Sequence, residues 1–119
     1  MKTSNNISPY FDKHFKSGWW LLFFFVCLGI SLESLHGFKI SWYLDASNET
    51  RRFLFTLGHA HGALLAIINI LFALSIEKFR NLENHIKVIS PCLLLSSILL
   101  PSGFLLGGLA INGGDPGVG

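Results

Sequence analysis

One glutamate and three histidines lie within the first two long apolar runs of this sequence, and their side chains can bind metals or move protons. They are Glu33, His36, His59 and His61. Imidazole nitrogens suit iron, copper and zinc, and a carboxylate beside a ligating histidine is a common supporting partner. The spacing of Glu33 and His36 places both on one helical face, as in the Glu-x-x-His pairs of di-iron helical proteins. The further carboxylates of a di-iron site are missing from the later apolar runs.

The two histidines of the second apolar run are predicted to point in different directions. His59 and His61 are two residues apart, so about 200° separates them on a regular helix, and they do not readily hold one metal ion together. Gly58 and Gly62 flank the two histidines, and the Gly-x-x-x-Gly spacing of these glycines permits close packing of membrane helices. We expect this stripe of small residues to be the surface where the second helix packs against the first, with one histidine at each edge. The stripe consists of Gly58, Gly62, Ala66 and Ala73, with Asn69 among them.

Three functions are open for the polar cluster. The side chains can hydrogen-bond to each other and to the backbone, which holds membrane helices in register. Alternatively, His36, His59 and His61 can ligate haem or a transition metal, with Glu33 beside them. In the third hypothesis, Glu33 and the histidines form a proton or cation relay in a small transporter. The sequence contains no nucleophile–histidine–acid set, phosphate loop or pair of catalytic carboxylates, so it does not predict an enzyme.

Three apolar runs must position these residues, at about 18–38, 53–76 and 86–111. Half of the 119 residues are hydrophobic and 13% are charged, whereas soluble domains have about 25% charged residues. Each run is long enough to cross a hydrocarbon layer of about 30 Å. We predict one all-α transmembrane domain over 1–119, an integral membrane antiparallel bundle of three helices. The glycine-rich end at 112–119 is predicted to form a turn, and a fourth helix is missing if the chain is a fragment.

The distribution of basic residues favours a multi-pass cell membrane protein with a cytoplasmic N-terminus. Six basic residues fall on the N-terminal side of the membrane and three on the other. The six are Lys2, Lys13, Lys16, Lys78, Arg80 and Lys87, and the three are Lys39, Arg51 and Arg52. This orientation puts the four residues of the polar cluster at a common depth near the outer face, with His59 about 9 Å and His61 about 12 Å into the second helix.

Composition also limits the partners of the chain. The formal net charge is +2 and the basic residues are dispersed, which excludes the basic stripe of a nucleic-acid-binding protein. The expected partner is the lipid bilayer, with a homo-oligomer or a second membrane subunit left open. Aromatic residues at both ends of the first helix are predicted to be interfacial anchors: Trp19, Trp20, Trp42 and Tyr43.

Several short strings resemble a group of small bacterial polytopic membrane proteins with no established activity. They are Leu32-Glu-Ser-Leu-His-Gly-Phe-Lys39, Tyr43-Leu-Asp45, Glu49-Thr-Arg-Arg52 and Gly58-His-Ala-His-Gly62. The resemblance covers the first two helices and implies a bacterial inner-membrane protein. The chain is also similar in length to small multidrug transporters, which carry an essential glutamate in their first helix. Here Glu33 lies near the end of that helix, which departs from their pattern.

Overall fold

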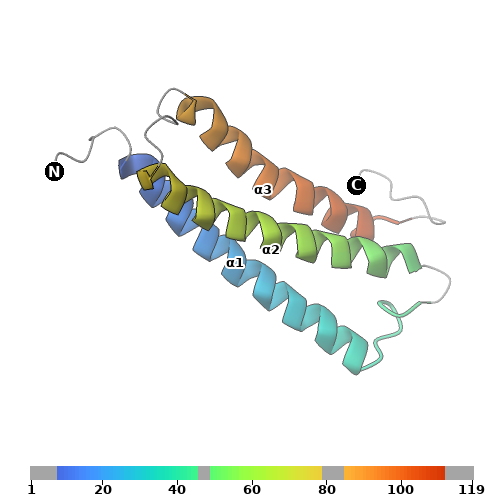
Figure 1. The fold of residues 1–119 in the computed structure, drawn as a ribbon. Coiled ribbons are helices and arrows are strands. Elements are labelled where there is room, and N and C mark those ends of the chain that lie inside the picture. The colour runs from blue at the N-terminus through green and yellow to red at the C-terminus, as the bar shows by residue number, and fades with distance from the viewer. Residues whose placement is uncertain (1–7, 46–48, 79–84, 112–119) are drawn as a thin grey trace.

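The computed structural model describes residues 8–45, 49–78 and 85–111 (Figure 1). They form three helices, α1 (Ser8–Gly37), α2 (Glu49–Lys78) and α3 (Ile86–Leu109). These residues contain no strand, which confirms the predicted all-α class. All three helices are long and apolar enough to cross a membrane. The 30 residues of α1 and of α2 span about 45 Å each, more than a hydrocarbon layer of about 30 Å requires.

Helix α1 begins at Ser8, well before the predicted start at about residue 18. Pro9 occupies the first turn, where the missing N–H leaves no bond unmade. The charged residues of this segment, Asp12, Lys13 and Lys16, are exposed, whereas His14 and Gly18 are buried one turn apart. The N-terminal flank is therefore an amphipathic extension of the first helix.

The other two helices lie close to their predicted positions. Helix α2 extends a few residues beyond the predicted 53–76, with Glu49 in its first turn and Lys78 in its last. These charges complement the helix dipole. Helix α3 begins at the predicted Ile86 and ends at Leu109. The turn predicted at 112–119, like residues 79–84 of the loop before α3, lies outside the described residues.

Helix α2 lies between α1 and α3, and successive helices run in opposite directions (Figure 1). Direct contacts between α1 and α3 are few. On α1, a Cβ atom added at Gly18 would be 3.0 Å from the Ala66 carbonyl oxygen of α2. Such a close approach of two helices requires a residue without a side chain.

The stripe of small residues on α2 is divided between both neighbours. Gly62 faces the ring of Phe25 on α1, whereas Gly58 faces Leu105 and the Pro101 carbonyl on α3. Positions four residues apart are rotated by about 40° around a helix. Because α2 is the middle helix, this rotation is enough to place the two glycines against different partners. The prediction that the whole stripe packs against the first helix is therefore correct for Gly62 and wrong for Gly58, which packs against α3.

Candidate functional site

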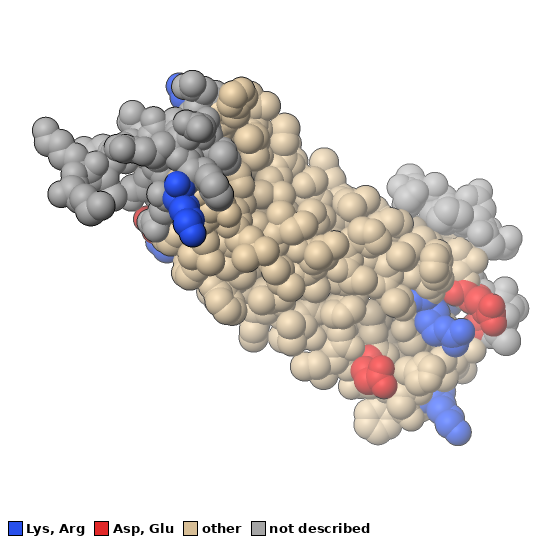
Figure 2. All heavy atoms as spheres, in the orientation of Figure 1, with Lys and Arg blue, Asp and Glu red and all other residues tan. Residues whose placement is uncertain are grey.

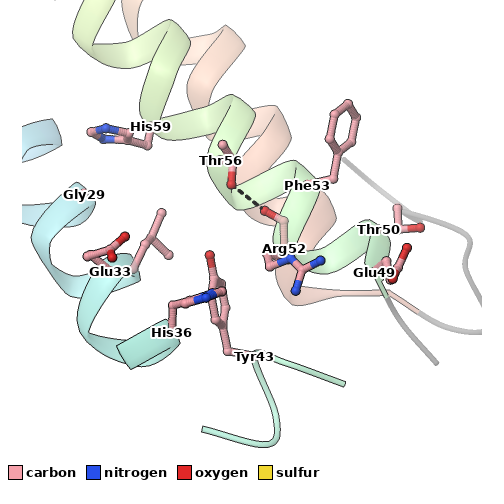
Figure 3. Close-up of a pocket in the computed structure, with 11 residues that line it drawn as sticks. Gly29, Glu33, His36, Tyr43, Glu49, Thr50, Arg52, Phe53, Thr56 and His59 are labelled. Carbon is pink, nitrogen blue, oxygen red and sulfur yellow. Dashed lines mark hydrogen bonds between the residues drawn. The ribbon is translucent and has the colours of Figure 1, made fainter. Parts of the chain in front are cut away.

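A cleft of about 740 Å³ lies between the C-terminal half of α1 and the N-terminal half of α2 (Figure 3). We call it the α1–α2 cleft. Its lining comes from both helices and from the loop that joins them. The lining residues are Gly29, Leu32, Glu33, His36, Tyr43, Glu49, Thr50, Arg52, Phe53, Thr56 and His59.

Three of the four residues in the predicted polar cluster line this cleft. They are Glu33, His36 and His59. His61 lies elsewhere, because its ring is centred 5.1 Å from the ring of Phe104 on α3. Its Nδ1 atom is 2.9 Å from the Leu57 carbonyl oxygen of its own helix. The two histidines of α2 thus contact different helices, as expected from their angular separation of about 200°.

His59 is held in one orientation by the backbone of α1. Its Nδ1 atom is 2.8 Å from the Phe25 carbonyl oxygen. A carbonyl oxygen only accepts, so Nδ1 carries the proton and donates it. In a neutral imidazole the other nitrogen, Nε2, then has a free lone pair. No hydrogen bond joins Nε2 to any residue that the structure describes, and the ring lines the α1–α2 cleft.

Gly29 provides the space for this ring. A Cβ atom built on Gly29 would be 2.5 Å from Cε1 and 2.9 Å from Nε2 of His59. Figure 3 shows the His59 side chain extending from α2 toward the helix that carries Gly29. Gly29 was not among the residues predicted to form the site. The available signal was a lone glycine within a helical run, a position that usually has a packing reason.

Gly29→Ala is expected to displace the His59 ring and break its hydrogen bond to Phe25. The added methyl group would lie only 2.5 Å from Cε1, closer than two carbon atoms can approach, so the imidazole must rotate away. Histidine side-chain ¹⁵N shifts of the protein in micelles should change from one fixed tautomer of His59 to a mixture. Gly37→Ala is the matched control, since nothing lies within 4 Å of a Cβ atom there. Unchanged His59 shifts in Gly29→Ala would contradict the close contact.

The loop after α1 contributes Tyr43, which is 4% exposed. Its ring centroid lies 6.4 Å from that of Phe55 on α2. The expectation that Tyr43 is an interfacial anchor is therefore corrected. The loop is folded back onto α2, with Tyr43 N–H donating to the Ile40 carbonyl, and this turn carries the side chain into the protein.

Arg51 connects this loop to the ends of two helices. Its guanidinium group lies 4.5 Å from the centroid of the Trp42 ring and donates to the Trp42 carbonyl oxygen at 2.8 Å. It also donates to the Gly108 carbonyl in the last turn of α3, at 3.3 Å. A cation at that end of a helix is favourable. Arg51 thus stabilises the structure that borders the cleft, while its neighbour Arg52 lines the cleft itself.

The arrangement suits some metal centres better than others. Within the described part of the chain, no three His, Cys, Asp or Glu side chains form a group that could hold a metal ion. A bare zinc ion takes at least three protein ligands. Haem iron needs only one or two axial side chains, because the porphyrin provides the rest. A cleft with two histidines on facing helices therefore matches haem more closely than it matches a bare ion.

A second polar cluster joins all three helices near the start of α1. The fully buried ring of His14 lies with Nδ1 2.7 Å from Asn69 Oδ1 on α2. Its Nε2 lies 2.8 Å from Ser90 Oγ on α3. Asn69 Nδ2 donates to Ser97 Oγ at 2.6 Å and to the Leu65 carbonyl at 2.8 Å. Asn69 was predicted from the sequence to pack between helices, whereas His14, Ser90 and Ser97 were not predicted to contact it.

The donors and acceptors of this second cluster fit together in one consistent pattern. The Asn69 amide oxygen can only accept, so His14 Nδ1 carries a proton and donates it to Asn69 Oδ1. Ser90 can then donate to Nε2 of a neutral His14. Ser97 donates to the Leu93 carbonyl at 2.7 Å. Every buried polar side chain of the cluster is thus satisfied, as membrane or core burial requires.

No known protein family, curated protein or solved structure matches this chain. The resemblance to small bacterial membrane proteins remains a hypothesis.

Proposed function

We propose that this chain is a multi-pass membrane protein that binds haem in the α1–α2 cleft, with His59 as an axial ligand. The observation that carries the proposal is the hydrogen bond from His59 Nδ1 to the Phe25 carbonyl, 2.8 Å long. Metal-ligating histidines almost always donate their other ring N–H to a carbonyl or carboxylate, which orients the ring and fixes the ligating nitrogen. In this arrangement the ligating atom is Nε2 of His59.

The membrane part of the proposal is supported by the surface of the molecule. On the face drawn in Figure 2, the described charged residues lie toward the two ends, and a broad band between them is uncharged. Large apolar side chains are exposed on all three helices, among them Phe23 of α1, Leu71 of α2 and Leu99 of α3 at 63%, 55% and 65%. Water disfavours such a surface, whereas lipid accommodates it. An antiparallel three-helix bundle in a bacterial inner membrane is therefore our proposal.

His36 is the candidate for the second axial ligand. It lines the cleft from α1 and follows Gly29, which contacts the His59 ring, by two helical turns, or about 10 Å. The cleft volume of about 740 Å³ lies within the range of about 300–1,000 Å³ that is usual for cofactor sites. Arg52 lines the same cleft and carries the planar guanidinium that best pairs with carboxylates such as haem propionates.

Two other hypotheses address the same residues. A structural role for His59 rests on the same hydrogen bond to Phe25, because that bond joins α1 to α2. The transporter hypothesis relies on Glu33, which is an exposed residue of the cleft and has no separate support. Haem binding is distinguished from both by a direct spectroscopic signature.

The test is a titration of the purified full chain in detergent with haemin. We expect one haem per chain and a Soret band shifted from that of free haemin. Removing a residue that only supports a metal ligand costs roughly 10–100-fold in metal affinity. His59→Ala removes the proposed ligand itself, so it should weaken haem binding by at least about tenfold. His61→Ala is the matched control, because His61 lies on the same helix and contacts α3.

His36→Ala provides an independent check of the second ligand. If His36 occupies the other axial position, its loss should convert a low-spin haem spectrum to a high-spin one. A wild-type protein that binds no stoichiometric haem overturns the proposal and leaves His59 as a structural contact. Equal affinities of His59→Ala and wild type would remove His59 from the site.

A further inference from the structure

The outward face of α1 carries an aromatic groove of about 440 Å³. Its five lining residues recur at helical spacing and therefore share one face: Phe15, Lys16, Trp19, Trp20 and Phe23. We call this surface the α1 groove. Trp19, Trp20 and Phe23 are 53%, 73% and 63% exposed, so neither α2 nor α3 covers them. The opposite face of α1, with His14, Gly18 and Phe25, is buried.

The aromatic rings of the α1 groove stand at steep angles to each other. Phe15 and Trp19 lie 6.3 Å apart between ring centroids with an interplanar angle of 74°. Trp20 and Phe23 are also 6.3 Å apart, at 87°. Both pairs have the edge-to-face geometry that aromatic rings favour. Four of the five residues that line the groove are aromatic, so it suits an apolar group such as an acyl chain.

Charge and depth indicate what fits the groove. Lys16 lies beside Phe15 at the end of the groove nearest the start of α1, and Lys13 is exposed one turn earlier. Phe23 is seven residues further along, or about 10 Å deeper. A cation at the shallow end and aromatic rings at the deep end match the order of phosphate and acyl chain in a phospholipid. Tryptophan favours this same boundary, because its ring is apolar and its N–H is polar.

We propose that the α1 groove binds one anionic phospholipid, with Lys16 contacting the phosphate and an acyl chain lying between the aromatic rings. Lysine near a membrane surface attracts anionic headgroups. The proposal rests on the membrane part of the proposed function, because the groove must lie in a bilayer. It does not depend on haem, which would bind nearer the other end of α1, where Gly29, Glu33 and His36 line the α1–α2 cleft.

The experiment is tryptophan quenching in phosphatidylcholine vesicles that contain the full-length protein. The chain has three tryptophans, so Trp42→Phe leaves only Trp19 and Trp20 as reporters. Brominated phosphatidylglycerol and brominated phosphatidylcholine are compared as quenchers over a range of mole fractions. We expect phosphatidylglycerol to bind about fivefold more tightly at the reporters, the ratio that one exposed lysine provides.

Two lysine variants make the result specific. Lys16→Gln should abolish the preference for phosphatidylglycerol, so that both lipids bind with about equal affinity. Lys87→Gln should keep it, because Lys87 is exposed at the start of α3 and does not line the groove. Equal quenching by both lipids in the protein with Lys16 would overturn the proposal, as would an equal loss of preference in both variants. Quenching by neither lipid would overturn membrane insertion together with it, so the two failures are distinguishable.

Discussion

Replacing Asn69 with leucine is expected to lower the free energy of unfolding by about 1–3 kcal/mol, the cost of leaving a buried polar group unsatisfied. The Asn69 side chain is fully buried and accepts from His14 Nδ1 at 2.7 Å. Leucine has a similar size but no acceptor, so the His14 N–H loses its partner. If His14 changes tautomer and donates to Ser90 instead, the unpaired atom becomes the Nδ1 lone pair. One buried polar group stays unsatisfied in both cases.

Unfolding in mixed micelles, followed by circular dichroism, measures this loss. Ser75→Ala is the control on the same helix, since Ser75 donates only to the Leu71 carbonyl one turn away. Its cost should be at most about 0.5 kcal/mol, as for most changes away from special features. His14→Phe completes a double-mutant cycle with Asn69→Leu, and the two changes should be strongly non-additive. Additive effects would show that the two side chains do not interact.

Gly62→Ala is expected to destabilise the protein by about 1–3 kcal/mol, the usual cost of overpacking a close contact. A Cβ atom at Gly62 would overlap the ring of Phe25, and Phe25 is itself 4% exposed. The ring cannot move outward without opening the interface between α1 and α2. A single methyl group therefore tests whether these helices approach as closely as the structure shows.

Gly103→Ala is the matched control for Gly62→Ala. Both positions are inside helices, and alanine favours a helix over glycine by about 1 kcal/mol in each case. Nothing lies within 4 Å of a Cβ atom at Gly103, so this change should be neutral or slightly stabilising. Phe25→Leu, which removes the overlapping ring atoms, should reduce the additional cost of Gly62→Ala. Equal stability of the two glycine variants would contradict the packing of Gly62 against Phe25.

The class of structure could be predicted because apolar length is a local property of the sequence. The second and third helices were placed to within a few residues for this reason. The start of α1 was not, because Asp12, Lys13 and Lys16 make the segment polar on average. The buried face of that segment, with His14 and Gly18 one turn apart, has helical periodicity that average polarity conceals.

The candidate site could be predicted only in part. Helical spacing and depth brought Glu33, His36 and His59 to one cleft, and the angle between neighbouring histidines separated His61 from His59. Spacing alone did not identify which helix each histidine contacts. Gly29 and Arg52 were not recognised as cleft residues, because their roles depend on the rotation of α1 relative to α2.

The sequence by itself determined three apolar helices and the residue types available along each of them, because helix formation and apolar length depend on neighbours in the chain. Only the tertiary structure decided that His59 donates to the Phe25 carbonyl and that His14 contacts both Asn69 and Ser90. These contacts depend on how far each helix is rotated about its axis. That rotation is set by close approaches at single positions, such as Gly29 beneath the His59 ring, between residues far apart in the chain.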